Sequence, residues 1–305
     1  MKRIGYWVKF IGFLLLFFLI YKIGWKETIA SIQKISFHHF LISLLILWVA
    51  FYLKSVRWRV ISISYGIPLN NYRAFKVFFI GLFLANITPG RLGDFGRLLY
   101  IKDVLPNQKV GWASLIMDRI FDLICLLLFS LVALFYYQLN FTILKLPKND
   151  GSILFWISGV ILFAIFILIF RRKFIKIISP WWEAFNSHDL GYAKSFGSFF
   201  LTCLSMSLIY GVFNYIAFSM GLQIDHLGLF LGTFILGILT LLPISILGIG
   251  VRETSLVIIF KLYGLPAQDA IALSLIIFLI QLISFIPGAI WFYLSPIRLQ
   301  DLRRS

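Results

Sequence analysis

A polar, glycine-rich segment interrupts an apolar part of this chain. It runs from Asn86 to Arg97, reads Asn-Ile-Thr-Pro-Gly-Arg-Leu-Gly-Asp-Phe-Gly-Arg, and lies between apolar runs at 77–85 and 98–101. Proline removes a backbone donor and glycine weakens a helix. Unpaired backbone and charge are costly in lipid, so protein or a water-filled cavity must surround such a segment. The sequence therefore predicts a broken helix at membrane depth, with helix breaks at Pro89 and Gly90.

The composition places the rest of the chain in a bilayer. Of its 305 residues, 61% are hydrophobic and 13% are charged, whereas soluble domains carry about 25% charged residues. Apolar stretches of about 20 residues recur, the length that a helix needs to cross the bilayer core. The fold class that we predict is an all-α polytopic membrane protein.

The net charge of +16 does not indicate a nucleic-acid partner. Most basic residues lie between apolar spans, where anionic lipids and the positive-inside bias account for them. One basic cluster, Lys54, Arg57 and Arg59, follows the apolar span 40–53 and is expected at the cytoplasmic face. This distribution predicts a multi-pass protein of the plasma membrane with both termini in the cytoplasm.

The predicted topology has about six transmembrane helices and two re-entrant broken-helix hairpins. The second hairpin breaks at Pro243 and Gly248 and enters from outside, whereas the first enters from the cytoplasm. The two halves, about 1–137 and 152–298, share a faint likeness, with Ser114-Leu115-Ile116 matching Ser274-Leu275-Ile276. Likeness with opposite orientation indicates an inverted-topology repeat. We expect one transmembrane domain over 1–305 and no soluble catalytic domain.

Eight ionisable residues lie around the two breaks, four basic and four acidic: Arg91, Asp94, Arg97, Asp118, Arg119, Asp122, Arg252 and Glu253. Charged residues in membrane segments face the bundle interior or a cavity and find partners. Five of them, Asp94, Asp118, Arg119, Asp122 and Glu253, are assigned to a charge network. That network either takes part in transport or is a static set of ion pairs that holds irregular backbone together.

Three arginines are the candidate ligand-binding residues: Arg91, Arg97 and Arg252. Each lies just after a break, near the expected start of a half-helix, where free amides and the helix dipole attract phosphate or carboxylate. Arginine adds a bidentate grip on such groups. A lipid head-group site is therefore predicted from these arginines with Asn86, Gly93 and Gly250.

Three ordered motifs resemble a known family. They are Asn86-x-x-Pro89-Gly90-Arg91-x-Gly93-Asp94-x-x-Arg97, Asp118-Arg119-x-x-Asp122-Leu123 and Gly248-x-Gly250-Val251-Arg252-Glu253. They are similar to the lysylphosphatidylglycerol synthase transmembrane region, a flippase-like family. The resemblance implies a lipid-translocating membrane domain, which in the best-known members moves an aminoacylated phosphatidylglycerol. We expect no aminoacyl-transferase domain of the kind that some members carry, and Phe278 lies in the last span where members often have arginine.

Three functions follow as hypotheses. The first is a transporter that moves an anionic or aminoacylated phospholipid, or a polyprenyl-linked lipid, between leaflets without a cofactor. The second is an enzyme on a lipid or polyprenyl phosphate, with Asp118 and Asp122 binding a divalent metal. The third is a membrane scaffold for a separate synthase or glycosyltransferase. The sequence has no nucleotide-binding motif, no metal-ligand spacing such as His-Glu-x-x-His and no nucleophile with its base, so no catalytic or metal residue is assigned.

Overall fold

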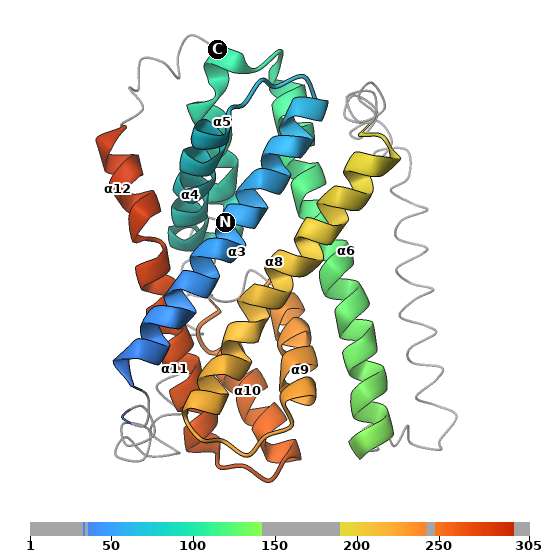
Figure 1. The fold of residues 1–305 in the computed structure, drawn as a ribbon, viewed down its shortest axis with the longest axis vertical. Helices are drawn as coiled ribbons and strands as arrows, with labels where there is room; N and C mark the ends of the chain where they lie inside the picture. The colour runs from blue at the N-terminus through green and yellow to red at the C-terminus, as the bar shows by residue number, and fades with distance from the viewer. Residues whose placement is uncertain (1–32, 34–35, 142–189, 242–247, 296–305) are drawn as a thin grey trace, which may run out of the picture.

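The computed structural model describes residues 33, 36–141, 190–241 and 248–295 (Figure 1). The predicted spans at 11–20 and 153–170, and the predicted break at Pro243, lie outside these residues. Within the described part every regular element is a helix. Four helices are long and apolar enough to cross a membrane, and one shorter helix is apolar along its length. The predicted all-α membrane fold is confirmed.

The described residues of the first half form four α-helices and two short 3-10 helices. They are α3 (Phe37–Ser64), α4 (Asn71–Ile87), η1 (Pro89–Gly96), α5 (Arg97–Tyr100), η2 (Lys102–Val104) and α6 (Gln108–Phe141). The second half contains α8 (Tyr192–Ser219), α9 (His226–Leu239), α10 (Val251–Leu262), α11 (Ala267–Ser284) and α12 (Ile286–Leu294). The predicted last span, Ala267–Leu294, is one of the four candidate spans. A one-residue interruption at Phe285 divides it into α11 and α12, because Pro287 cannot donate a helical hydrogen bond.

The helices of the two halves follow the same order and spacing. Helix α3 and helix α8 each have 28 residues, and α8 begins 155 positions after α3. The same interval separates the starts of α4 and α9. It also separates Gly66 and Gly221, which end the first helix of each half with φ of 73° and 72°. A left-handed glycine after a helix is a common stop signal, and its repetition supports the predicted repeat.

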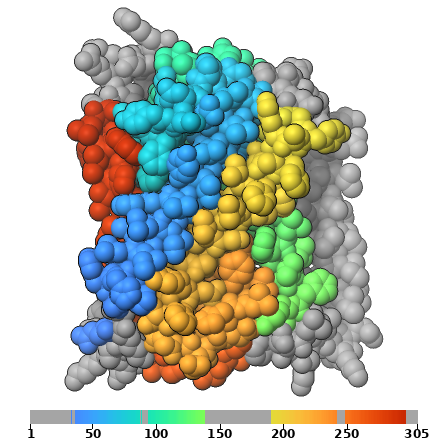
Figure 2. All heavy atoms as spheres, in the orientation of Figure 1, coloured from blue at the N-terminus to red at the C-terminus, as the bar shows by residue number. Residues whose placement is uncertain are grey.

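The halves are arranged in opposite directions. Figure 1 shows α3 rising and α8 descending, so α4 begins near the upper end of the molecule and α9 near the lower end. Both helices then run toward the middle of the molecule, where α4 ends at Ile87 and α9 ends at Leu239. Helices α3 and α8 pack against each other along their lengths, and Figure 2 shows them side by side across one face. Opposed broken helices of this kind are the arrangement that an inverted repeat produces.

Helix α3 does not end at its basic cluster, contrary to the sequence prediction. It continues through Lys54, Arg57 and Trp58 to Ser64, and these three side chains are buried. The prediction treated the cluster as the cytoplasmic edge of a short span. The helix can continue because carboxylates on α6 pair with Lys54 and Arg57, which removes the main cost of charge at this depth.

Candidate functional site

The break after α4 is fixed by Thr88 and Gly93. Helix α4 ends at Ile87, Thr88 donates its hydroxyl to Leu84 O at 2.7 Å, and Gly93 N donates to Thr88 Oγ1 at 2.7 Å. A Cβ at Gly93 would lie 2.2 Å from Leu84 O, so only glycine fits this turn. The segment that follows is a 3-10 helix, Pro89–Gly96, rather than the α half-helix expected from sequence.

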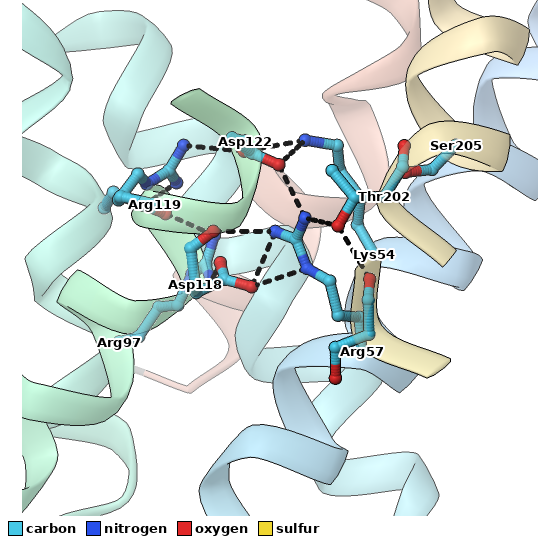
Figure 3. A network of polar contacts seen from close by, with 10 residues as sticks. Lys54, Arg57, Arg97, Asp118, Arg119, Asp122, Thr202 and Ser205 are labelled. Atoms are coloured by element: carbon cyan, nitrogen blue, oxygen red, sulfur yellow. Dashed lines mark hydrogen bonds and ion pairs between the residues drawn. The ribbon is translucent and has the colours of Figure 1, made fainter. Parts of the chain in front are cut away.

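Helix α6 presents two carboxylates to α3. Arg57 contacts Asp118 Oδ1 through Nη2 at 2.7 Å and through Nε at 3.0 Å, and its Nη1 lies 2.6 Å from Asp122 Oδ1 (Figure 3). Lys54 donates to both Asp122 oxygens, at 2.9 and 2.8 Å. Asp118 and Asp122 lie four residues apart and therefore face the same side of α6, which is why one helix face can neutralise both bases.

The network reaches the second half of the chain through α8. Arg57 Nη1 donates to Thr202 Oγ1 at 2.7 Å, and Thr202 donates in turn to Ser198 O at 2.7 Å (Figure 3). Arg57 has a side chain only 1% exposed. A single guanidinium therefore joins α3, α6 and α8 inside the bundle.

Arg97 completes the buried part of the network. Its Nη2 lies 2.5 Å from Asp94 Oδ1 and its Nη1 lies 3.4 Å from Asp118 Oδ2. The guanidinium carbon lies 4.4 Å from the ring centre of Phe78 and 5.2 Å from that of Trp58, both cation–π distances. The side chain also passes over Gly81, where a Cβ would lie 2.5 Å from Arg97 Nε.

Arg119 is the accessible member of the network. Its side chain is 33% exposed, whereas Asp94, which it contacts, is 6% exposed. Arg119 Nη1 also lies 3.6 Å from Asp122 Oδ2. Asp94 is thus held between Arg97 on its own segment and Arg119 on α6. A ligand that approaches from outside the bundle meets Arg119 first.

The second break forms a separate and smaller cluster. Arg252 donates to Ser274 Oγ at 2.7 Å, to Gln281 Oε1 at 3.1 Å and to Glu253 Oε1 at 3.2 Å. Ser274 also donates to Glu253 Oε1 at 2.6 Å. The other Glu253 oxygen accepts from Gly250 N at 2.5 Å, so the carboxylate occupies the start of α10. Gly250 has φ of 85°, a conformation that favours glycine.

The predicted head-group residues thus divide into distinct environments. Asn86 donates to Leu82 O at 2.6 Å, while the amides of Gly93 and Gly250 are bonded to Thr88 and Glu253. Arg97 lies in the first cluster and Arg252 in the second. Of the predicted helix breaks, Pro89 and Gly90 begin the 3-10 segment and Gly248 lies in the turn before α10, with φ of 76°. The side chain of Arg91 is outside the described part of the structure.

The two clusters differ in net charge. Among the described side chains, the first cluster has four bases and three acids: Lys54, Arg57, Arg97, Arg119, Asp94, Asp118 and Asp122. Its described members therefore carry one excess positive charge. The second cluster pairs one arginine with one glutamate and is neutral. The sequence reasoning treated the charges around both breaks as one balanced set, and the structure separates them.

Two members of the first cluster, Lys54 and Arg57, and their contact Thr202 were not predicted from the sequence. Lys54 and Arg57 were assigned to a membrane edge, and Thr202 was not considered. A signal existed, because the two bases lie three residues apart and the helix continues beyond them to Ser64. Charges at that position need internal partners. Thr202 carried no comparable signal, since threonine is common in apolar helices.

These features define a class of protein. It is a multi-pass α-helical membrane protein with a largely buried network of arginine, lysine and aspartate side chains at the first break. Within that class, the sequence model of the lysylphosphatidylglycerol synthase TM region matches residues 7–288. The chain belongs to this family.

Curated archaeal membrane proteins are similar to the chain. UPF0104 membrane protein MJ1595 of Methanocaldococcus jannaschii is 22% identical over 93% of this chain and 92% of its own length. MJ1078 of the same organism is 27% identical over 70% of this chain and 94% of its own length. For PH1989 of Pyrococcus horikoshii the identity is 27%, over 43% of this chain and 40% of that protein's length. The predicted family is confirmed.

Proposed function

We propose that this chain moves a lipid with an anionic or aminoacylated head group between the leaflets of the plasma membrane, with both termini in the cytoplasm. The family description supports a role connected with membrane lipids. The observation that carries the proposal is the first cluster, in which four bases and three acids are described and Arg119 is accessible, with a side chain 33% exposed. Arginine side chains bind phosphate and carboxylate groups. A lipid head group that carries such a group could bind at the cluster while its acyl chains remain in the bilayer.

The way the halves contact each other supports movement by alternating access. Near the middle, Arg57 of the first half bonds to Thr202 of the second. Tyr136, near the end of α6, bonds to Asp225 at the start of α9, and Tyr137 donates to Gly228 O at 2.8 Å. These helix ends lie toward the lower end of Figure 1. Inverted repeats change access by rocking one half against the other around a central site. As the halves rock, contacts at one depth can form while contacts at another depth break.

Reconstitution of the purified full-length chain tests the proposal. Liposomes would contain phosphatidylglycerol labelled on an acyl chain with a fluorophore that external dithionite bleaches. We expect bleaching to pass well beyond the outer-leaflet fraction only when protein is present. No movement of phosphatidylglycerol, lysylphosphatidylglycerol or a polyprenyl phosphate would refute transport and would favour the scaffold hypothesis. Metal-dependent conversion of the lipid, detected by mass spectrometry, would favour the enzyme hypothesis.

A matched pair of arginine variants separates a role of the cluster from a general charge effect. Arg119→Gln removes the accessible cation of the cluster. Arg73→Gln removes an arginine with a side chain 30% exposed that is also paired with an aspartate, Asp103. A hydrogen bond to a charged group contributes about 1.5–3 kcal/mol, so we expect Arg119→Gln to slow transport about ten-fold or more. Arg73→Gln should leave transport within about two-fold of the parent, because the contacts that it loses, with Asp103 and Tyr100 O, lie outside the first cluster.

A further inference from the structure

Asp94 is the most weakly held carboxylate of the first cluster. Asp118 accepts two hydrogen bonds from Arg57, and Asp122 accepts from Lys54 and Arg57. Among the described side chains, Asp94 forms ion pairs with two arginines, Arg97 and Arg119. It also lies on the 3-10 segment, whose hydrogen bonds are poorer than those of an α-helix. Of the three acids, Asp94 is the one that can leave its position with the least loss.

The fit between Asp94 and Arg97 is incomplete. The two side chains approach to 2.5 Å, yet Asp94 Oδ1 makes no hydrogen bond of regular geometry with any described residue. Arg97 Nε, also buried, makes none either. Buried polar atoms are nearly always hydrogen-bonded, so exceptions call for a physical reason. The carboxylate of Asp94 therefore supplies the negative charge at this position, but its short side chain does not form hydrogen bonds of regular geometry there.

The position that Asp94 occupies can be reached from outside. Arg119, its second partner, has a side chain 33% exposed, while Asp94 itself is 6% exposed. A head group bound first to Arg119 would lie next to Asp94. A phosphate has several acceptor oxygens and can bind two guanidinium groups together, which one aspartate does only imperfectly here.

We propose that Asp94 is an internal substitute for the ligand anion, held between Arg97 and Arg119 until a lipid phosphate displaces it. The inference rests on the proposed function and deepens it by naming the group that the ligand replaces. Displacement removes the ion pair between the Pro89–Gly96 segment and Arg119 of α6, while the contact of Phe95 with Trp112 remains, so anion binding is coupled to the way in which the break is held against α6. The apparent affinity for the ligand is the intrinsic affinity multiplied by the fraction of protein in which Asp94 has left the two arginines. It is therefore low while Asp94 occupies the position.

Direct binding to the full-length chain in detergent tests this. The probes are dioctanoyl-phosphatidylglycerol, dioctanoylglycerol with the same acyl chains and no phosphate, and inorganic phosphate. We expect Asp94→Asn to bind dioctanoyl-phosphatidylglycerol about five-fold or more tighter than the parent, a coupling within the usual range. Binding of dioctanoylglycerol should not change. If Asp94→Asn raises the affinity for dioctanoyl-phosphatidylglycerol more than the affinity for inorganic phosphate, the position binds a lipid head group. If the affinity for the lipid rises by an equal or smaller factor, the position binds a free anion, and the inference of a lipid ligand is overturned.

Two further variants keep the test decisive. Asp94→Glu retains the charge and should bind as weakly as the parent. Asp103→Asn removes a carboxylate from the exposed pair with Arg73 and should change nothing. If the parent binds the lipid and folded Asp94→Asn binds it no more tightly, or less tightly, Asp94 is not a substitute for the ligand anion. The transport proposal would remain intact. If the parent binds none of the phosphate-bearing probes and moves no lipid in liposomes, the transport proposal itself fails.

Discussion

The two breaks of this protein occupy equivalent places and have different chemistry. Arg97 and Arg252 lie 155 positions apart, the interval that relates the helices of the two halves. Arg97 belongs to an extended network over α3, α6 and α8 with one excess positive charge among its described members. Arg252 belongs to a neutral cluster confined to α10 and α11. The proposed function accordingly assigns ligand binding to the first break and a supporting role to the second.

The residues that face the two arginines explain much of this difference. Ser114 matches Ser274 in the repeat, so the position four residues further on is Asp118 in α6 and Phe278 in α11. Arg97 lies 3.4 Å from Asp118, whereas the guanidinium of Arg252 lies 5.6 Å from the ring centre of Phe278. A carboxylate in α6 can form ion pairs with further basic side chains of α3, whereas an aromatic ring at the matching position of α11 cannot. We infer that this position separates the roles of the two halves.

The largest effect is expected from Arg57→Met. This change leaves Asp118 buried without its bidentate partner and removes one partner of Asp122. Breaking a buried pair costs about 3–5 kcal/mol. Arg252→Met should cost clearly less, because Glu253 keeps Gly250 N and Ser274 as donors. Thermal unfolding in detergent would compare the two variants. Equal losses would mean that the two clusters contribute alike to stability.

The next effect concerns the glycines that shape the breaks. Gly93→Ala brings a Cβ to 2.2 Å from the backbone oxygen of Leu84, and we expect a loss of about 3 kcal/mol. Gly248→Ala meets only Thr240 Cγ2 at 3.0 Å but keeps a φ of 76°, which costs about 1–2 kcal/mol.

Asparagine distinguishes the two causes. Because it tolerates left-handed backbone, Gly248→Asn should be milder than Gly248→Ala. Gly93→Asn should be as damaging as Gly93→Ala, since any Cβ meets the same oxygen. Stability would be followed by fluorescence-detected size exclusion after heating. A rescue of position 93 by asparagine would contradict a steric cause.

Sequence patterns predicted the fold more completely than the site. Apolar runs and the Pro-Gly interruption were enough to predict helices and a broken α4, because both follow from local chemistry. The partner of Arg57 could not be predicted in the same way, since Asp118 is 61 positions away and only packing brings the two together. The same applies to Arg252, whose hydrogen bonds to Ser274 and Gln281 depend on how α11 packs against α10.

A smaller effect is expected from the matched serines of the repeat. Ser274 Oγ accepts from Arg252 and donates to Glu253, so Ser274→Ala should cost about 1–2 kcal/mol. Ser114 Oγ donates only to Gly111 O, at 2.8 Å within its own helix. Ser114→Ala should cost less than about 1 kcal/mol. Denaturation of the two variants under one condition measures the difference. A larger loss at Ser114 would contradict the view that the second break is the one that depends on this hydroxyl.

The smallest effect separates the helix caps of the two halves. Asn70 caps α4 and Asp225 caps α9, again 155 positions apart. Burial alone would raise the pKa of Asp225, but hydrogen bonds from Tyr136, Tyr263 and the amides of Leu227 and Gly228 hold it below its ordinary value.

A carboxyl whose pKa is lower in the folded state stabilises the fold above its ordinary pKa, and that stabilisation is lost as the pH falls through the folded-state value. Acidification should therefore loosen the lower end of the bundle in the parent protein. In Asp225→Asn this contribution is missing at every pH, while Asn70→Asp should introduce a similar acid sensitivity at the start of α4. Thermal midpoints measured from about pH 6 down to about pH 2, a window that passes through the ordinary aspartate pKa of about 3.9 and continues below it, would show the two opposite changes. An unchanged pH profile in Asp225→Asn would mean that this carboxylate does not stabilise the contact between the halves.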